Sequence, residues 1–271
     1  MSKFILQEEG ISLGDIQVRL AKNDNEIRQA QALRYKIFYE EFQAKRSAAI
    51  ESEKRDFDHF DDFTDNLVVI DKSIVDPQKS IVGTYRMLRE DQAEKAGRFY
   101  TSDEFDISKL VDNHSDLLEM GRSCVLEPYR TKAVLQLLWQ GIAEYVVHHE
   151  IQFLFGCASF HGTDPQEHAN ELSFLYHNNL APEEYRPRAL PDVYTKMDLV
   201  DPSTIEMKTV LRNLPPLIKG YMRIGGYVGD GAFVDHDFGT TDVCVVLNTE
   251  TMTDSYQKHY ERKTGAEFSK K

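Results

Sequence analysis

Residues 119–125 read Glu-Met-Gly-Arg-Ser-Cys-Val, and Pro128-Tyr129-Arg130 follow shortly after. The first stretch has the apolar character of an interior strand that carries one acid and one base. Beyond Pro128, apolar side chains recur at helical spacing over residues 131–149, which predicts a helix. Residues 151–156 then form a short apolar run typical of a buried strand. A strand, a helix and a strand in this order predict a parallel crossover unit.

Upstream of this unit, strand and helix patterns alternate. The predicted elements are a strand at 16–21, a helix of about 24–43 capped by Asn23 or Asp24, an acidic loop at 44–65, and an antiparallel hairpin of strands 67–70 and 81–88. Together with the crossover unit they predict an α/β fold. We expect one domain over residues 1–253, with a core of about 16–160, a C-terminal elaboration of about 161–253, and a polar tail at 254–271.

Composition limits the possible partners. Of 271 residues, 41% are hydrophobic, which is enough for a large core. The formal net charge of −13 disfavours nucleic acid as a partner, because neutralising phosphates requires clustered Lys and Arg. Basic residues outnumber acids locally, in 28–55 and 186–223. These segments could bind an acidic carrier protein or an anionic lipid surface, or they could be ordinary solvated surface. Three separated cysteines, no signal sequence and no membrane-spanning apolar run predict a cytoplasmic protein.

Acyl transfer to an amine needs an uncharged amine near a thioester carbonyl, a group to receive its proton, and donors for the developing oxyanion. Glu119 is the candidate acid, and the alternative reading is an acid that merely pairs with Arg122 or another arginine. Regular strand alternation puts 119 and 122 on opposite faces, so they share a site only if a bulge intervenes. The helix start after Arg130 presents N–H groups suited to a phosphate.

Other constellations match known sites less well. Ser159 resembles a nucleophile elbow only loosely, because the flanking glycines are misplaced. Cys124 and Cys157 are read most simply as buried thiols. No metal is expected, because the spacing of the possible ligands matches no standard site: Cys157, His161, Asp164, His168 and His177.

The chain resembles the GNAT-type acyltransferases, in the branch that holds the ornithine-lipid N-acyltransferases and their hemolysin-like relatives. The resemblance spans roughly residues 18–247. It rests on the order and spacing of seven pieces: 33–41, Asp58 with Asp61-Asp62, 82–88, 99–106, 119–125, 154–160 and 214–221.

This resemblance implies a GNAT-like fold, in which a central mixed, largely antiparallel sheet is flanked by helices. It also implies transfer of a 3-hydroxyacyl group from acyl carrier protein to the α-amine of ornithine, giving lyso-ornithine lipid. The donor would be a phosphopantetheine thioester, with no permanently bound cofactor. Many GNAT enzymes that use coenzyme A carry glycines at the turn where this chain has Ala133 and Leu135, which favours the carrier protein. A lipidic product is compatible with peripheral contact with the inner membrane.

Site residues are carried over by position. Glu119 would accept or relay the amine proton, and Arg122 with Arg86 would fix polar groups near the thioester. Asp58 or Asp61 would hold a cationic substrate. The predicted substrate-binding residues are Arg34, Asp58, Asp61 and Arg86, and the predicted acyl-donor-binding residues are Val125, Arg130, Lys132 and Ala133.

Three alternatives follow from the same residues. The order Arg, Asp, Asp, Arg, Glu-x-x-Arg also resembles acyl-homoserine-lactone synthases, which are usually shorter and lack a counterpart of residues 214–231. Another GNAT acyltransferase is the second alternative, and a non-catalytic acyl-carrier or membrane-interaction module is the third. The acceptor amine also stays open between ornithine, lysine and glutamine.

Overall fold

The computed structural model describes residues 5–252, which form two compact units. Residues 5–97 and 120–151 make up the first unit, and residues 98–119 and 152–252 the second. Strand β6 (Leu117–Val125) passes from the second unit into the first after Glu119. The predicted single domain stays a prediction, and the predicted polar tail lies outside the described residues.

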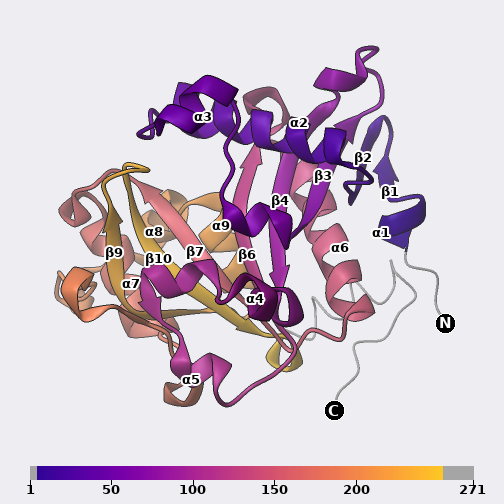
Figure 1. The fold of residues 1–271 in the computed structure, drawn as a ribbon. Helices are drawn as coiled ribbons and strands as arrows, with labels where there is room; N and C mark the ends of the chain where they lie inside the picture. The colour runs from indigo at the N-terminus through magenta and orange to yellow at the C-terminus, as the bar shows by residue number, and fades with distance from the viewer. Residues whose placement is uncertain (1–4, 253–271) are drawn as a thin grey trace. The chain divides into compact units, whose positions relative to one another are not determined.

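The first unit is a sheet with helices packed on it (Figure 1). Its strand order is β1-β2-β3-β4-β6, and the pairs from β1 to β4 are antiparallel, which confirms the predicted hairpin. The strands are β1 (Ile11–Leu13), β2 (Ile16–Leu20), β3 (Asp65–Asp71) and β4 (Ile81–Arg89), and the helices are α1 (Ile5–Glu8), α2 (Asp24–Tyr35), α3 (Ala48–Glu53), α4 (Glu90–Ala96) and α6 (Lys132–His148).

Alternation along β3 decides which helix covers which face of this sheet. Val68 packs in one hydrophobic cluster with Leu33 of α2. Its neighbour Leu67 lies on the other face, where a Cβ added to Gly141 of α6 would come within 3.2 Å of it and 2.8 Å of Val18. Helices α2 and α6 therefore cover opposite faces, and the close approach at Gly141 expected for a glycine inside a helix is present.

Helix α2 begins where the sequence predicts, with Asn23 as its N-cap. The helix expected to reach residue 43 changes at Lys36 into the π-helical η1 (Lys36–Glu41). The prediction of a loop at 44–65 was wrong in part, because α3 and the single-turn helix η2 (His59–Asp62) lie within it. Helix α3 buries no side chain, so it leaves no hydrophobic period in the sequence.

The second unit has the strand order β6-β7-β10-β9-β8-β5. Strands β6 and β7 pair in parallel, as the crossover prediction requires, whereas β10 is antiparallel to both β7 and β9. The remaining elements are β5 (Phe105–Asp106), β7 (Phe153–His161), β8 (Arg188–Ala189), β9 (Tyr227–Asp235), β10 (Thr240–Asn248), α5 (Ser108–Val111), α7 (Ala169–Asn179), α8 (Met207–Asn213) and α9 (Pro216–Arg223).

One face of the second unit's sheet lies under the segment 98–106, and we call it the covered face. The rings of Phe99 and Phe155 meet edge to face with centroids 5.0 Å apart. Two residues farther along β7, the thiol of Cys157 lies 3.8 Å from the hydroxyl of Thr101. The covered face is therefore held against a short irregular segment rather than against a helix.

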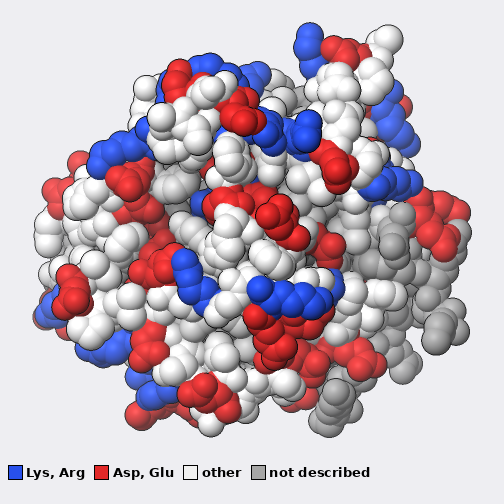
Figure 2. Space-filling model, viewed as in Figure 1, with Lys and Arg blue, Asp and Glu red and all other residues white. Residues whose placement is uncertain are grey.

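The described surface is charged and mixed. On the face drawn in Figure 2, acidic and basic side chains are interspersed. No helix within residues 5–252 combines the length and the apolar character that a bilayer-spanning segment requires. Few large apolar side chains are exposed in this part of the chain, namely Leu13, Phe42, Val75, Val193, Met207 and Leu211.

Candidate active site

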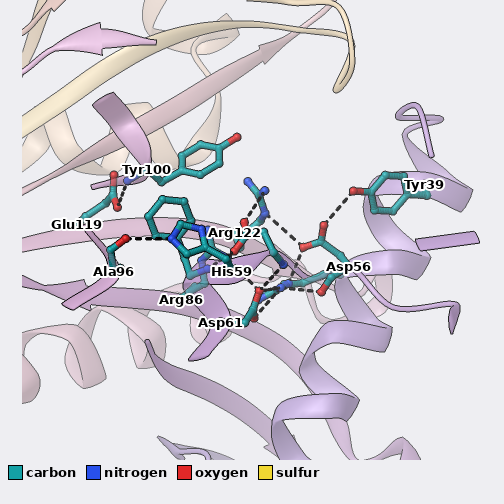
Figure 3. Close-up of polar contacts among 12 residues, drawn as sticks. Tyr39, Asp56, His59, Asp61, Arg86, Ala96, Tyr100, Glu119 and Arg122 are labelled. Carbon is teal, nitrogen blue, oxygen red and sulfur yellow. Dashed lines mark hydrogen bonds and ion pairs between the residues drawn. The ribbon is translucent and has the colours of Figure 1, made fainter. Parts of the chain in front are cut away.

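Three arginines and three aspartates of the first unit form a network of ion pairs, which we call the charged cluster (Figure 3). Its members come from α2, from the turn around η2, from β4 and from β6. They are Arg34, Asp56, Asp58, Asp61, Arg86 and Arg122. All except Asp56 are among the residues predicted from the sequence, so the structure brings five predicted residues together.

The acidic run folds into the cluster because its aspartates cap η2. Asp58 is the N-cap, and its Oδ1 accepts the N–H of Phe60 at 2.9 Å. In return, Asp61 Oδ2 accepts the N–H of Asp58 at 3.0 Å. This reciprocal capping box fixes both carboxylates at one short turn. Arg86 of β4 then reaches both, with Nη1 2.6 Å from Asp58 Oδ1 and 3.1 Å from Asp61 Oδ2.

Arg34 is completely buried within the cluster, with an exposed fraction of 0%. Its Nε donates to Asp56 Oδ2 at 2.7 Å, and its Nη2 donates to Asp61 Oδ1 at 2.9 Å. Nη2 also donates to the carbonyl oxygen of Asp56 at 2.7 Å. Removing a charged guanidinium from water costs free energy, and its charge cannot be removed by deprotonation. It can therefore be buried only where carboxylates and carbonyls surround it.

Asp56 is the cluster member that is absent from the predicted site. Its Oδ1 accepts the hydroxyl of Tyr39 at 2.9 Å, and its Oδ2 lies 3.3 Å from Arg122 Nε as well as beside Arg34. Asp56 thus joins α2, η1 and β6 at one carboxylate. Its position two residues before Asp58 does not by itself mark it as a cluster member, because several acids occur in the same stretch.

Arginine charges keep the buried carboxylates ionised. Burial by itself raises the pKa of Asp56, but the charges of Arg122 and Arg34 and the hydrogen bond from Tyr39 outweigh burial and hold the pKa below its usual value. Burial opposes ionisation of Asp61 as well, and arginine charges again hold its pKa below the ordinary range. The buried carboxylates of Asp56 and Asp61 therefore stay ionised at neutral pH.

These charges cancel, since three arginines face three aspartates. The side chain of Asp61 is 6% exposed and is bonded to two arginines, so it has little negative charge to offer a substrate. Asp58 is the more accessible acid, with a side chain 26% exposed, and Arg122 is 13% exposed. The predicted role of Asp58 or Asp61 in holding a cationic substrate stays a prediction, which this geometry favours for Asp58 over Asp61.

Strand β6 is irregular at Arg122, whose φ of +52° lies in the left-handed region. A non-glycine residue in this conformation interrupts the regular alternation of a strand, as a bulge does. Regular alternation is therefore interrupted at Arg122, and the shared site of Glu119 and Arg122 stays a prediction.

Glu119 belongs to the second unit, where it holds the segment that crosses the covered face. Its Oε1 accepts the N–H of Thr101 at 2.6 Å, and its Oε2 accepts the N–H of Tyr100 at 2.9 Å, the latter drawn in Figure 3. The residue is 5% exposed. Two backbone donors stabilise the ionised carboxylate and fix its orientation.

The predicted donor-binding residues gather at the start of α6 in the first unit. Arg130 makes a two-pronged ion pair with Glu41, at 2.6 and 2.8 Å, and its Nε donates to the carbonyl oxygen of Val125 at 2.9 Å. Thr131 caps the helix by accepting the N–H of Val134. The next residues, Lys132 and Ala133, are exposed in the first helical turn, where N–H groups point out of the helix.

The environments of Ser159, Cys124 and Cys157 do not suit a nucleophile. Ser159 lies in the middle of β7 rather than at a turn from strand to helix, so it is not a nucleophile elbow. Burial raises the pKa of Cys124 to about 12 and that of Cys157 well above its usual value, which leaves both as thiols at neutral pH. Cys124 is buried, as interpreted from the sequence, whereas Cys157 is only partly buried.

Known proteins resemble this chain over most of its length. Residues 33–140 match the family model described as an acetyltransferase (GNAT) domain. An L-ornithine N(alpha)-acyltransferase of Agrobacterium fabrum (strain C58) is 48% identical over 92% of this chain and 86% of its own length. One of Brucella abortus (strain 2308) is 45% identical over 92% of this chain and 89% of its own length. Among solved structures, FeeM, an N-acyl amino acid synthase from uncultured soil microbes, matches with a TM-score of 0.49 and 10% identity over 90% of this chain and 97% of that one.

Proposed function

This chain belongs to the family of L-ornithine N(alpha)-acyltransferases, and from that premise we propose that it joins an acyl group to the α-amine of ornithine. The similarity over nearly the whole chain carries the proposal, because it includes both units. The GNAT-like fold predicted from the sequence is confirmed, since the family model matches and the sheet is mixed and largely antiparallel. The predicted alternative, an acyl-homoserine-lactone synthase, is not favoured by these relatives.

The proposed reaction forms an amide bond and breaks a thioester bond. The α-amine attacks the acyl carbonyl carbon, the C–N bond forms, the C–S bond breaks, and the thiol leaves with a proton that the amine gives up. Glu119 is the proposed acceptor or relay of that proton, since a carboxylate oxygen can accept more than one hydrogen bond. The backbone clamp at Tyr100 and Thr101 keeps this carboxylate in one orientation.

We assign different roles to the members of the charged cluster. Arg34 and Asp61 are buried and paired with each other, so they position their neighbours rather than touch substrate. Arg122 and Asp58 are more exposed, so these two are the members proposed to contact polar groups of the substrates. Arg86 is 4% exposed and bonded to Asp58, so its predicted contact with substrate would act through Asp58. Asp56 positions Arg122 through an ion pair, and Tyr39 in turn positions Asp56 through a hydrogen bond.

The proposed donor is the phosphopantetheine thioester of acyl carrier protein. Arg130 and Lys132 supply positive charge at a helix start whose N–H groups suit one phosphate. The turn lacks the glycines that let a backbone approach the pyrophosphate of coenzyme A closely, which favours a donor with a single phosphate. An acidic carrier protein also requires basic residues, which this acidic chain concentrates in a few places.

Incubation of the full chain with 3-hydroxyacyl carrier protein and ornithine should yield N-acylornithine, detected by mass spectrometry. Lysine and glutamine serve as competing acceptors, and ornithine should be preferred over each by at least about tenfold in kcat/KM. Lysine is longer by one methylene group, and glutamine lacks the positive charge of the ornithine side chain. Acyl-coenzyme A should be a poorer donor than the carrier protein. Absence of an amide with all three amines would contradict the proposal, and a lactone product would restore the alternative.

We further propose peripheral contact with anionic lipid through α8 and α9. Residues 207–223 contain four Lys or Arg and no Asp or Glu, in a chain of net charge −13. On α8, Met207 and Leu211 lie one turn apart and are 57% and 42% exposed. Exposed apolar side chains flanked by Lys and Arg are typical of helices that lie in a membrane interface. A lipidic product would leave the enzyme at such a surface.

Replacing both Met207 and Leu211 by Asp should weaken binding to vesicles of phosphatidylglycerol and phosphatidylcholine by about tenfold or more, because two inserted apolar side chains are lost and two negative charges face the lipid. Cosedimentation measures the effect. Val75→Asp, at a site 96% exposed in the first unit, is the control and should bind as the wild type does. Equal binding by the double variant would refute the proposal, and selective loss of carrier-protein binding would assign the surface to that partner instead.

A further inference from the structure

Gly121 of β6 has open space where any other residue would carry a side chain. A Cβ added to Gly83 or to Gly141 would come within 2.9 or 2.8 Å of a valine side chain, so the protein itself fills the space beside those two glycines. A Cβ added to Gly121 would meet no heavy atom of residues 5–252 within 4 Å, its two chain neighbours aside. Packing of the described chain therefore does not account for a glycine at this position.

The backbone conformation does not account for it either. The φ angles of Gly14 and Gly97 are +61° and +92°, a range that favours glycine, whereas the φ of Gly121 lies outside this range. The irregularity of β6 places the left-handed conformation on Arg122 instead. An alanine at position 121 would thus avoid the strain that a positive φ imposes.

The open space lies where an interior strand becomes accessible. Strand β6 stands between β4 and β7 in the strand order, and its residues 117–120 are buried. Residues 121–123 are half-buried, and the strand is buried again at Cys124. Glycine weakens a strand, because it has no side chain to pack and loses more conformational freedom on folding than other residues. A glycine inside a strand is typical of a place where a ligand approaches the backbone closely.

The residue next to Gly121 indicates which ligand this is. Arg122 has a side chain that is 13% exposed, and it is one of the two cluster members proposed to contact substrate. Its guanidinium only donates hydrogen bonds, so it suits the carbonyl and hydroxyl oxygens of a 3-hydroxyacyl thioester and repels a cationic amine. The C2 methylene group of that thioester lies between these two oxygens. It carries only hydrogen atoms, so it can lie against a backbone that has no side chain.

We infer that the open space beside Gly121 receives carbons C1 to C3 of the acyl donor, so that Gly121 determines which acyl groups reach Arg122. The inference rests on the proposed function and adds a residue that acts through its lack of a side chain. A methyl group at position 121 would occupy the volume of these substrate carbons. It would leave the packing of the described protein as it is, because no protein atom lies there.

Gly121→Ala tests the space without disturbing the fold. The variant should raise KM for 3-hydroxyacyl carrier protein by about tenfold or more, because the added methyl group overlaps the bound substrate. KM for ornithine should change little. The thermal midpoint should stay the same or rise, because alanine restricts the unfolded chain and meets no protein atom in the folded one. Gly121→Val should weaken donor binding further, since two more methyl groups enter the same space.

Gly141→Ala is the matched control, because it adds the same methyl group elsewhere in the first unit. There the new Cβ would lie 2.8 Å from Val18 and 3.2 Å from Leu67, so the core must shift to admit it and the thermal midpoint should fall. KM for the donor and KM for ornithine should both stay near their wild-type values. The two variants thus separate a clash with the protein from a clash with the substrate.

An unchanged donor KM in Gly121→Ala and Gly121→Val would overturn the inference while leaving the proposed function standing. A rise in KM for ornithine alone would assign the space to the amine and overturn it as well, and so would a thermal midpoint that falls together with activity. If the wild type forms no acylornithine, calorimetry with 3-hydroxyacyl carrier protein still decides. Equal affinity of wild type and Gly121→Ala would overturn the inference, and a wild type that binds no donor would overturn it together with the proposed donor.

Discussion

Replacing Glu119 by Gln should lower kcat for ornithine acylation by about 100- to 10,000-fold, the range expected when a positioned proton acceptor is lost. The amide cannot take up the amine proton, and its NH₂ group would face one of the two N–H donors that the carboxylate binds at Tyr100 and Thr101. Steady-state kinetics should show the loss in kcat more than in KM. The dependence of kcat/KM on pH should also change, because the positioned proton acceptor is absent.

The controls for Glu119 separate chemistry from folding. Glu127→Gln, at an exposed position just beyond the same strand, should leave kcat and the thermal midpoint unchanged. Glu119→Asp keeps the charge and should retain more activity than Glu119→Gln. If Glu119→Gln keeps full activity, Glu119 has no part in proton transfer. A lower thermal midpoint with an unchanged pH profile would instead reduce it to a clamp for residues 99–104.

Arg34→Met should lower the free energy of unfolding by about 3–5 kcal/mol, the usual cost of removing one member of a buried ion pair. Met fills much of the volume, so the loss is chiefly electrostatic: Asp56 and Asp61 stay buried with fewer compensating charges. Urea unfolding measures the change. Arg28→Met, on an exposed site of the same helix, is the control and should change stability by less than about 0.5 kcal/mol.

The pH dependence of Arg34→Met follows from the lowered pKa values of Asp56 and Asp61. A carboxyl group whose pKa falls on folding contributes stability above its unfolded pKa of about 3.9, and this contribution is lost as the pH falls through the folded value. The stability gap between wild type and Arg34→Met should therefore be widest near neutral pH and narrow below about pH 4. A gap that is constant with pH would mean that packing, not charge, accounts for the effect.

Periodic apolar patterns predicted most of the elements that the site needs. Strand β6, helix α6 and the β3–β4 hairpin were all read correctly, because each buries a regular face. The same logic missed α3, which buries nothing and begins at its Ser47 cap. It also ended β7 at residue 156, since the strand's last five residues carry Cys157 and Ser159 on the covered face rather than an apolar run.

The residues of the candidate site were harder to predict from the sequence than the fold was. Arg34, Asp58, Asp61, Arg86 and Arg122 were found through a family resemblance, and the structure shows why they occur together, since each neutralises another. Asp56 went unnoticed because nothing local distinguishes an acid that binds a distant arginine from one in solvent.

In the proposed donor site, the carboxylate of Glu41 occupies Arg130 and would compete with the donor phosphate for its guanidinium group. An arriving phosphate must exchange places with a carboxylate that already satisfies the guanidinium at two points. A small anion that offers only its charge gains little from such an exchange. A donor that also brings an acyl chain and a protein surface gains from the whole contact, so the resident carboxylate acts as a threshold that discriminates between ligands before any chemistry begins.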